Sequence, residues 1–489
     1  MRKAGLPVAG IVAIVVAGGP AAAATFYASP TGTAAACQAT KPCSLKKCIA
    51  KVGPGDTCEA ASGVYQDPPP LDASANCKPS APCTLKSSTP LGAVLVVDSE
   101  GPPLLSVFGN HWTVDGFLVR MNVQRMFTVV RSERGFAWSN NRVEVRPGVG
   151  GEVLLTDGTD DVTVTGNWVH HHPGCQNGGG AYGPCGRHSR CDFDTGNGDA
   201  FLFMGDGVKT PTSGLVFSRN DYGHWQNPLR VRNFAKVLYS RNRCTNATNH
   251  GCLEANDVQG LVMENNIADI DTGAGCEDEI LQSALFDTYC FADVVLRNNT
   301  SVGHGIGWEQ QLDCLAPNAG ADKACTDGLA PEVGRDGTWY DYLRIYNNII
   351  YDGKPTSGAA GIELNTGQAS ASPSPCCYSD YNLIHSPAGK KVGIDLGKPF
   401  ATFAAWQAYG KDVHGVSTAP KFVDYCNTFG TKGCHDYRAA SVSAPQVDAG
   451  VGTSELPCPA DDFDGKPRSD GRCDIGAHEY LKTGGSAPR

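Results

Sequence analysis

Two arginines two residues apart give the clearest chemical signal in this chain. Arg230 and Arg232 alternate with Leu229 and Val231. Alternate side chains of a strand point to opposite faces, so both guanidinium groups should face outward while the apolar pair faces the core. Guanidinium groups side by side suit a carboxylate or a sulfate, because each offers paired, coplanar N–H donors. The spacing therefore predicts a site for an acidic ligand.

An acidic sugar is one ligand on which such a site could act. The proton beside a uronate carboxylate becomes removable only when the carboxylate charge is neutralised and a base is near. We expect Arg230 and Arg232 to neutralise that charge, with Lys209 or His250 as the base. In the alternative reading, the arginines only pair with Glu254 on a neighbouring strand, and exposed ion pairs of that kind stabilise a protein little.

A glycosidase is the second possible chemistry. It needs two carboxylates about 5–10 Å apart across one sugar bond. Glu254 and a carboxylate on an adjacent strand could satisfy this, because neighbouring strands lie about 4.8 Å apart. The register of Glu254 stays open, since Cys252 and Leu253 compete for the inward position.

Three further residues are candidates for substrate contacts. His224 and Trp225 follow a predicted turn and could supply a proton carrier and a ring that stacks on sugar. A tryptophan in this position suits a small apolar core equally well. Glu309 lies on a strand of the same series as Glu254.

Residues 192–199 carry acids at alternating positions on a glycine-rich loop, which suits Ca²⁺. The candidate ligands are Asp192, Asp194, Asn197 and Asp199. The loop is not an EF-hand, because Asn197 and Phe203 occupy the positions of the required glycine and glutamate. A turn with solvated acids explains the same residues without metal. The nearby histidines and cysteines match no standard zinc spacing.

A repeat must position these residues. Short apolar strands end in Asn or Asn-Asn, and the steps from Asn220 to Asn242 and from Asn242 to Asn266 are 22 and 24 residues. A fixed period of this size indicates a solenoid or a propeller. Between turns we find one or two strands rather than the four of a propeller blade, so we predict a parallel β-helix. Asparagine suits the strand end because it tolerates left-handed backbone and its amide can bond its copy one coil further on, forming a ladder.

Two long insertions, at residues 170–199 and 310–341, interrupt the coils. Projecting from one side, they would wall a groove over the middle coils, and a groove suits an extended polymer.

The chain ends and the composition indicate export. Residues 1–24 combine Arg2 and Lys3 with a short apolar stretch and four alanines, as in a secretory signal peptide. The 21 cysteines belong in an oxidising compartment, and pairs close in sequence predict local disulfides, among them Cys77/Cys83 and Cys458/Cys473. A net charge of −10 without a basic cluster argues against nucleic acid. No later apolar run could span a membrane, so we expect a secreted or periplasmic monomer.

Segments at both ends resemble the secreted right-handed parallel β-helix proteins of the pectate-lyase-like superfamily. The N-terminal part resembles their cap, and the C-terminal part resembles their closing motif; the matching segments are Thr25–Gly32, Pro42–Leu45, Val52–Thr57, Gly63–Tyr65, Asp462–Arg468 and Cys473–Tyr480. The resemblance implies the fold more strongly than the activity, because this fold hosts lyases, glycoside hydrolases, epimerases and non-catalytic surface proteins. We assign no chemistry to Asp461, Asp462 and Asp464, which fit a turn in the closing motif.

We therefore predict an all-β protein, a right-handed parallel β-helix solenoid with an N-terminal cap and loop insertions. The expected divisions are a signal peptide (1–24), a cap with the first coils (25–90), the β-helix (91–400), the C-terminal coils and closing cap (401–480) and a disordered tail (481–489). The expected function is cleavage of an acidic polysaccharide by β-elimination, with Ca²⁺ as a possible cofactor. The alternatives are hydrolysis through paired carboxylates and carbohydrate binding without turnover.

Overall fold

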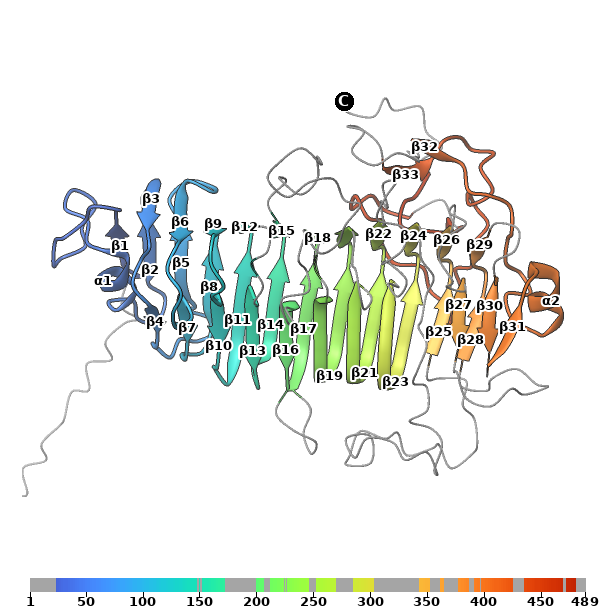
Figure 1. The fold of residues 1–489 in the computed structure, drawn as a ribbon, viewed down its shortest axis with the longest axis horizontal. Coiled ribbons are helices and arrows are strands. Elements are labelled where there is room, and N and C mark those ends of the chain that lie inside the picture. Colours follow the sequence, from blue (N-terminus) through green and yellow to red (C-terminus); the bar gives the residue numbers. More distant parts are fainter. Residues whose placement is uncertain are drawn as a thin grey trace, which may run out of the picture.

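The computed structural model describes most of the chain and has the predicted architecture (Figure 1). The residues described are 23–146, 149, 152–171, 199–205, 212–223, 225, 227–245, 252–269, 285–302, 343–351, 361–364, 377–386, 391–395, 397–424, 435–468 and 472–480. Strands stack in parallel along one long axis, each paired with its equivalent in the next coil. The chain is a parallel β-helix.

Each coil has three sides. The first side holds β4 (Leu71–Ala73), β7 (Leu105–Val107), β10 (Thr128–Val130), β13 (Leu154–Asp157) and β16 (Asp199–Met204). The second holds β1 (Thr25–Ala28), β2 (Thr57–Ala60), β5 (Cys83–Ser87), β8 (Trp112–Asp115), β11 (Arg134–Ser139), β14 (Asp160–Thr165), β17 (Thr212–Ser218), β25 (Leu343–Tyr346) and β28 (Cys377–Asp380). The third holds β3 (Gly63–Gln66), β6 (Ala93–Val97), β9 (Leu118–Met121), β12 (Arg142–Val145), β15 (Trp168–His171), β18 (Asp221–Gly223), β20 (Arg243–Thr245), β22 (Ile267–Asp269), β24 (Thr300–Val302), β26 (Ile349–Tyr351) and β29 (Leu383–His385).

In the middle coils the first two sides merge into single long strands, β19 (Asn227–Ser240), β21 (Leu253–Glu264) and β23 (Phe286–Arg297). β19 turns the corner where Asn233 and Lys236 both adopt positive φ, 56° each. Its first half pairs with β16 and its second half with β17. The candidate arginines lie on that first half.

The interior is filled by the inward residues of each strand, as the alternation predicts. Aromatic rings stack from coil to coil: Phe201 lies 5.9 Å from Trp138 and 4.9 Å from Phe217, both edge to face. All three side chains are fully buried. Edge-to-face packing of this kind adds to the free energy gained from burial alone.

The predicted asparagine ladder is present at the end of the second side. Each ladder residue accepts, through Oδ1, the backbone N–H and the Nδ2–H of the ladder residue one coil before it. Between Asn242 and Asn266 these distances are 2.8 and 3.1 Å. The described members are Asn141, Asn167, Asn220, Asn242, Asn266, Asn299, Asn348 and Asn382. The ladder ends on Asp412, a fully buried carboxylate that accepts both hydrogen bonds of Asn382. The last member of the ladder needs only to accept, so a carboxylate can take the place of an amide.

The left-handed backbone occurs at the residue before each ladder asparagine. Asn140, Asn265, Asn298 and Asn347 all have φ between 53° and 58°. An Asn-Asn pair therefore divides two tasks between two residues, since the first makes the bend and the second makes the ladder.

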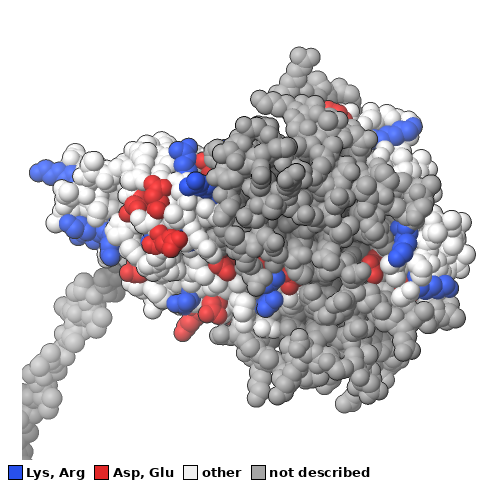
Figure 2. All heavy atoms as spheres, in the orientation of Figure 1, with Lys and Arg blue, Asp and Glu red and all other residues white. Residues whose placement is uncertain are grey.

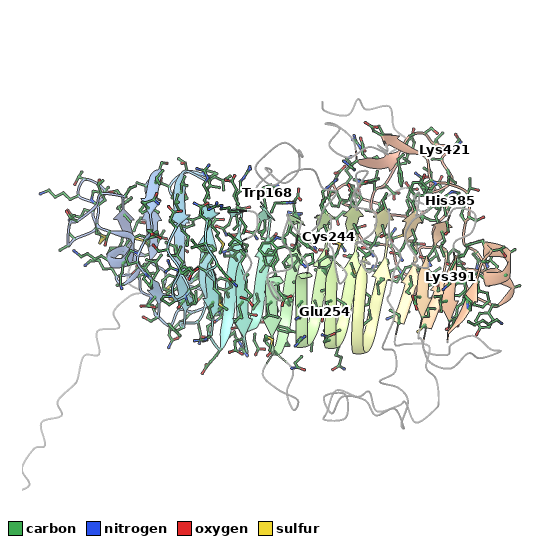
Figure 3. All side chains as sticks on the ribbon, in the orientation of Figure 1. Trp168, Cys244, Glu254, His385, Lys391 and Lys421 are labelled. Atoms are coloured by element: carbon green, nitrogen blue, oxygen red, sulfur yellow. A yellow bond between two sulfur atoms is a disulfide. The ribbon has the colours of Figure 1, made fainter. Side chains whose placement is uncertain are left out.

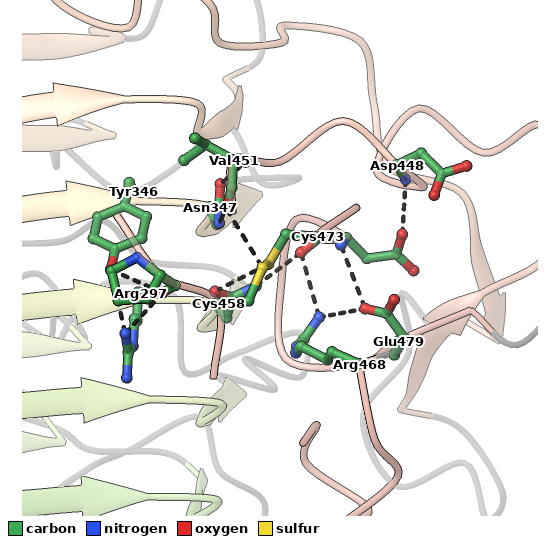
Figure 4. The surroundings of a disulfide bond; sticks show 12 residues. Arg297, Tyr346, Asn347, Asp448, Val451, Cys458, Arg468, Cys473 and Glu479 are labelled. Carbon is green, nitrogen blue, oxygen red and sulfur yellow. Dashed lines mark hydrogen bonds and ion pairs between the residues drawn. A yellow bond between two sulfur atoms is a disulfide. The ribbon is translucent and has the colours of Figure 1, made fainter. Parts of the chain in front are cut away.

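The C-terminal segment runs back along the solenoid, and here we call residues 435–480 the clasp (Figure 1). Asn265, Asn298 and Asn347 donate from Nδ2 to the clasp carbonyls of Asp461, Asp474 and Val451, at 2.7, 2.8 and 2.7 Å. Figure 4 shows Asn347 beside Val451 next to the Cys458–Cys473 disulfide. The bending asparagines thus fasten the clasp to the coils.

Smaller elements close the ends of the helix. Near the N-terminus, α1 (Leu45–Ile49) is capped by Ser44 and buries Leu45, Cys48 and Ile49. The C-terminal end holds β27 (Ile362–Leu364), β30 (Gly393–Asp395), β31 (Lys398–Phe400) and α2 (Phe403–Ala408), and the hairpin of β32 (Phe422–Asp424) and β33 (Asp436–Ala439) follows.

The described disulfides are Cys37–Cys43, Cys48–Cys58, Cys77–Cys83, Cys244–Cys252 and Cys458–Cys473. Both Cys77–Cys83 and Cys458–Cys473 match pairs expected from the sequence. These bonds fit an oxidising compartment. Residues 1–22, which include most of the predicted signal peptide, and residues 481–489 lie outside the described ranges. Within the described residues, no helix is long and apolar enough to cross a membrane.

Candidate functional site

The two arginines face outward from β19, as predicted. Leu229 and Val231 are buried at 0% and 1% exposure, and the side chains of Arg230 and Arg232 are 15% and 40% exposed. Their strand position follows from the alternation of apolar and polar residues.

Glu254 stands directly beside Arg230, because the two residues are register partners on β19 and β21. The register left open by the sequence is decided by Leu253, which is fully buried and pairs with the core residue Phe286. Cys252 is also buried, but it precedes the strand and is bonded to Cys244. Figure 3 labels Glu254 and Cys244 on the middle coils.

Arg230 is held between two buried carboxylates. Its Nε donates to Glu254 Oε2 at 2.9 Å, and its Nη1 lies 3.4 Å from Asp199 Oδ2. The side chains of Glu254 and Asp199 are each only 3% exposed. The expected ion-pair ladder between Arg230 and Glu254 therefore exists, but it is buried. Removing charges from water costs several kcal/mol per ion, so this cluster differs from an ordinary exposed pair.

Arg232 is less constrained than Arg230. Its Nη2 lies 3.9 Å from Glu254 Oε1, and its Nε has no hydrogen-bond partner among the described residues. Glu254 Oε1 instead accepts a hydrogen bond from Asn256 Nδ2 at 2.9 Å. The Arg232 side chain is 40% exposed and that of Arg230 only 15%, so Arg232 is the more accessible of the two to a ligand carboxylate.

Asn256 is a site residue that the sequence reasoning missed. It follows Glu254 by two residues and is the register partner of Arg232, so the same alternation that selected the arginines could have selected it. The backbone of Asp287 pairs with that of Glu254 one coil further on.

The prediction of Trp225 as a sugar-stacking ring is wrong. Its side chain is 2% exposed and packs within the main hydrophobic core. A ring enclosed in the core has no face available to a sugar. Trp225 is therefore a core residue, which was the alternative expected from the sequence.

The remaining candidates lie outside the described residues. These are Lys209, His224, His250, Glu309, Asp192, Asp194 and Asn197. Of the four predicted Ca²⁺ ligands only Asp199 is described, and one of its oxygens already faces the Arg230 guanidinium. The two predicted insertions also fall almost wholly outside, between β15 and β16 and between β24 and β25.

Figure 2 shows acidic and basic side chains interspersed over the N-terminal coils. This face provides no long-range attraction for a polyanion, and in the proposed site the contacts of Arg232 would supply a local one.

We also compared the chain with known proteins. No protein-family model and no curated protein sequence matches the chain. Among solved structures it is similar to pectate lyase Pel9A, with 13% identity over 94% of this chain and 96% of that one and a TM-score of 0.44. It is also similar to a mannuronic acid-specific polysaccharide lyase of family 6 from human gut microbiota (15% identity, 76% and 82% covered, TM-score 0.39). A third is a lacto-N-biosidase from Eubacterium ramulus (10% identity, 77% and 66% covered, TM-score 0.44). These are lyases and a glycosidase, and none assigns a reaction to this chain.

Proposed function

We propose that this protein cleaves a uronate-containing polysaccharide by β-elimination, at the outward row formed by β19 and β21. The observation that carries the proposal is Arg232, an outward arginine 40% exposed beside the buried ionic cluster of Arg230. In this mechanism Arg232 binds the uronate carboxylate and lowers the barrier to removing the neighbouring proton. Lys209 or His250 takes that proton, and the glycosidic oxygen leaves as the double bond forms.

Arg230 has a positioning role in this proposal. Its two carboxylate partners, Asp199 and Glu254, fix the guanidinium and balance its charge. Glu254 is fixed in turn by Asn256. Taking these charges out of water costs several kcal/mol per ion, so stability alone does not explain the cluster.

A glycoside hydrolase is the second candidate, and one observation favours it. The backbones of Glu254 and Asp287 are register partners on adjacent coils. In this alternative the two residues would act as the pair of carboxylates that a retaining glycosidase needs about 5 Å apart.

The test is an assay on pectate, alginate, glycosaminoglycans and neutral polysaccharides. It follows the ultraviolet absorbance of unsaturated uronates together with new reducing ends, with and without Ca²⁺ or a chelator. We expect both signals to rise on an acidic polymer. Reducing ends alone, lost in Glu254→Gln, would move the assignment to hydrolysis, and binding without products would leave a carbohydrate-binding protein.

A matched pair of variants tests the residue assignment. Arg232→Ala should lower kcat/KM by about 100-fold or more, as removal of a charge-stabilising donor does. Arg120→Ala is the control, since Arg120 is an outward arginine paired with Glu144 on the third side. Equal losses in both variants, or none in Arg232→Ala, would contradict the role of Arg232. A calcium requirement would support the loop at residues 192–199.

A further inference from the structure

A second cluster of side chains that could bind a metal lies in the clasp, apart from the cluster of Arg230, Asp199 and Glu254. Asp462 and Asp464 flank Phe463 in the turn that Asp461 and Pro467 close, and His478 comes from the last described segment, residues 472–480. One ligand atom from each of Asp462, Asp464 and His478 lies within 4.8 Å of the others. From the sequence alone, we expect Asp462 and Asp464 only to form a turn.

The histidine supplies an observation independent of the acids. The His478 side chain is 8% exposed, and its Nδ1 has no hydrogen-bond partner among the described residues. Nδ1 lies 3.7 Å from Asp464 Oδ2. That distance is too long for a hydrogen bond. Two ligands about 2.1 Å from one tetrahedral ion are about 3.4 Å apart, so a small adjustment would let both bind it.

The surroundings hold the three side chains in place. Asp462 is fully buried, and its two oxygens accept the backbone N–H groups of Lys466 at 2.8 Å and Glu479 at 3.1 Å. The rings of Phe463 and His478 pack edge to face, 5.3 Å apart. Each carboxylate oxygen can accept more than one bond, so Asp462 keeps capacity for an ion.

Charge at the cluster is compatible with a cation. The one cation in hydrogen-bond contact with Asp464 among the described residues is Lys466 Nζ, at 2.9 Å on a side chain 36% exposed. That side chain can move into solvent when an ion binds.

The donor set selects the type of ion. Two carboxylates and one imidazole suit Zn²⁺ or a similar first-row divalent ion, whereas Ca²⁺ prefers oxygen ligands alone. We propose that Asp462, Asp464 and His478 form a Zn²⁺-type site. It would join two arms of the clasp, residues 461–468 and residues 472–480.

The neighbours of the ligands explain what the site would do. Asp461 accepts from Asn265, and Ala477 N donates to Thr300 Oγ1 at 3.0 Å, so each arm is attached to the coils beside a ligand. A buried pair between Arg468 and Glu479, 2.6 Å apart, already links the arms (Figure 4). Metal binding would add a second link and stabilise the clasp by mass action.

The experiment uses the full protein, stripped with a chelator and then titrated with Zn²⁺ or Ca²⁺. Calorimetry, bound-metal content and the thermal unfolding midpoint are measured together. We expect one Zn²⁺ per chain at this site, a midpoint several degrees higher with Zn²⁺, and no comparable response to Ca²⁺. His478→Phe, which keeps the ring packing, should lose both responses, and the milder Asp464→Asn should weaken them.

His414→Phe is the matched control, because His414 makes an ordinary 2.7 Å contact with Asp380 elsewhere in the fold. It should behave like the wild type. The proposal is overturned if the wild type gains no stability with Zn²⁺, or if folded His478→Phe binds Zn²⁺ with unchanged stoichiometry and affinity. These readouts do not depend on polysaccharide cleavage.

Discussion

Individual asparagines either connect neighbouring coils of this solenoid by hydrogen bonds or form the bends between its strands. Asn141 is 1% exposed, donates to Val114 O and Asn167 Oδ1, and accepts the Phe117 N–H. Its neighbour Asn140 is exposed and has φ of 54°. Adjacent residues of one type therefore serve different physical purposes, one by hydrogen bonding in the core and the other by its backbone conformation.

This difference is testable. Asn141→Ala should lower the free energy of unfolding by about 2 kcal/mol or more, because it leaves a buried N–H and a buried carbonyl without this partner. Asn140→Gly should be nearly neutral, because glycine adopts positive φ at no steric cost. Chemical denaturation of both variants provides the measurement. Similar losses in the two would show that the ladder does not have the stabilising role given to it here.

At the scale of elements, the long strands β19 and β21 assemble the candidate site. Arg230 and Glu254 come together only because neighbouring coils place them in register. The Cys244–Cys252 disulfide joins the end of β20 to the start of β21, immediately before Glu254. It therefore fixes the point at which the site strand begins.

Removing that disulfide should affect both stability and activity. For a loop of this length the chain-entropy model gives a loss of about 2.5 kcal/mol. We expect the Cys244→Ala/Cys252→Ala double variant to unfold at lower denaturant and to lose polysaccharide cleavage. The Cys37→Ala/Cys43→Ala pair in the N-terminal coils should retain cleavage. Unchanged activity in the first variant would mean that the start of β21 needs no covalent support.

At the scale of the whole molecule, the clasp connects coils that lie far apart in the sequence. One of its carboxyl groups, Asp474, makes the free energy of unfolding depend on pH. Burial raises the pKa of Asp474 to about 6, partly opposed by backbone N–H donors and by Arg468. The folded state then binds this proton more tightly than the unfolded chain does. The contribution of Asp474 to stability is therefore fully present below about pH 4 and is lost as pH rises through 6, by up to about 3 kcal/mol.

The comparison with Asp474→Asn isolates this group, because other titrations, including that of His478, are shared by both proteins. Relative to the variant, the wild type should lose stability between about pH 4 and pH 6.5, measured by denaturant unfolding at each pH. A difference independent of pH would contradict the raised pKa.

The sequence determined the fold and the outward row because both follow from local periodicity. Recurrent strand-end asparagines predicted the stacked coils and the ladder, and alternation placed Leu229 and Val231 inside and Arg230 and Arg232 outside. Two cysteine pairs also followed from their closeness in the chain. A repeat of this kind can be recognised along the sequence, because every coil contacts mainly its neighbours and therefore has similar requirements.

Only the tertiary structure decided which side chains meet across coils and where the clasp runs back along the solenoid. The register of Glu254, its contact with Asn256 and the burial of Trp225 depend on stacking between coils, which alternation within one strand does not specify. The cluster of Asp462, Asp464 and His478 depends on the turn that folds the clasp back on itself. Contacts between residues far apart in sequence arise from packing of the whole chain, and no local pattern encodes them.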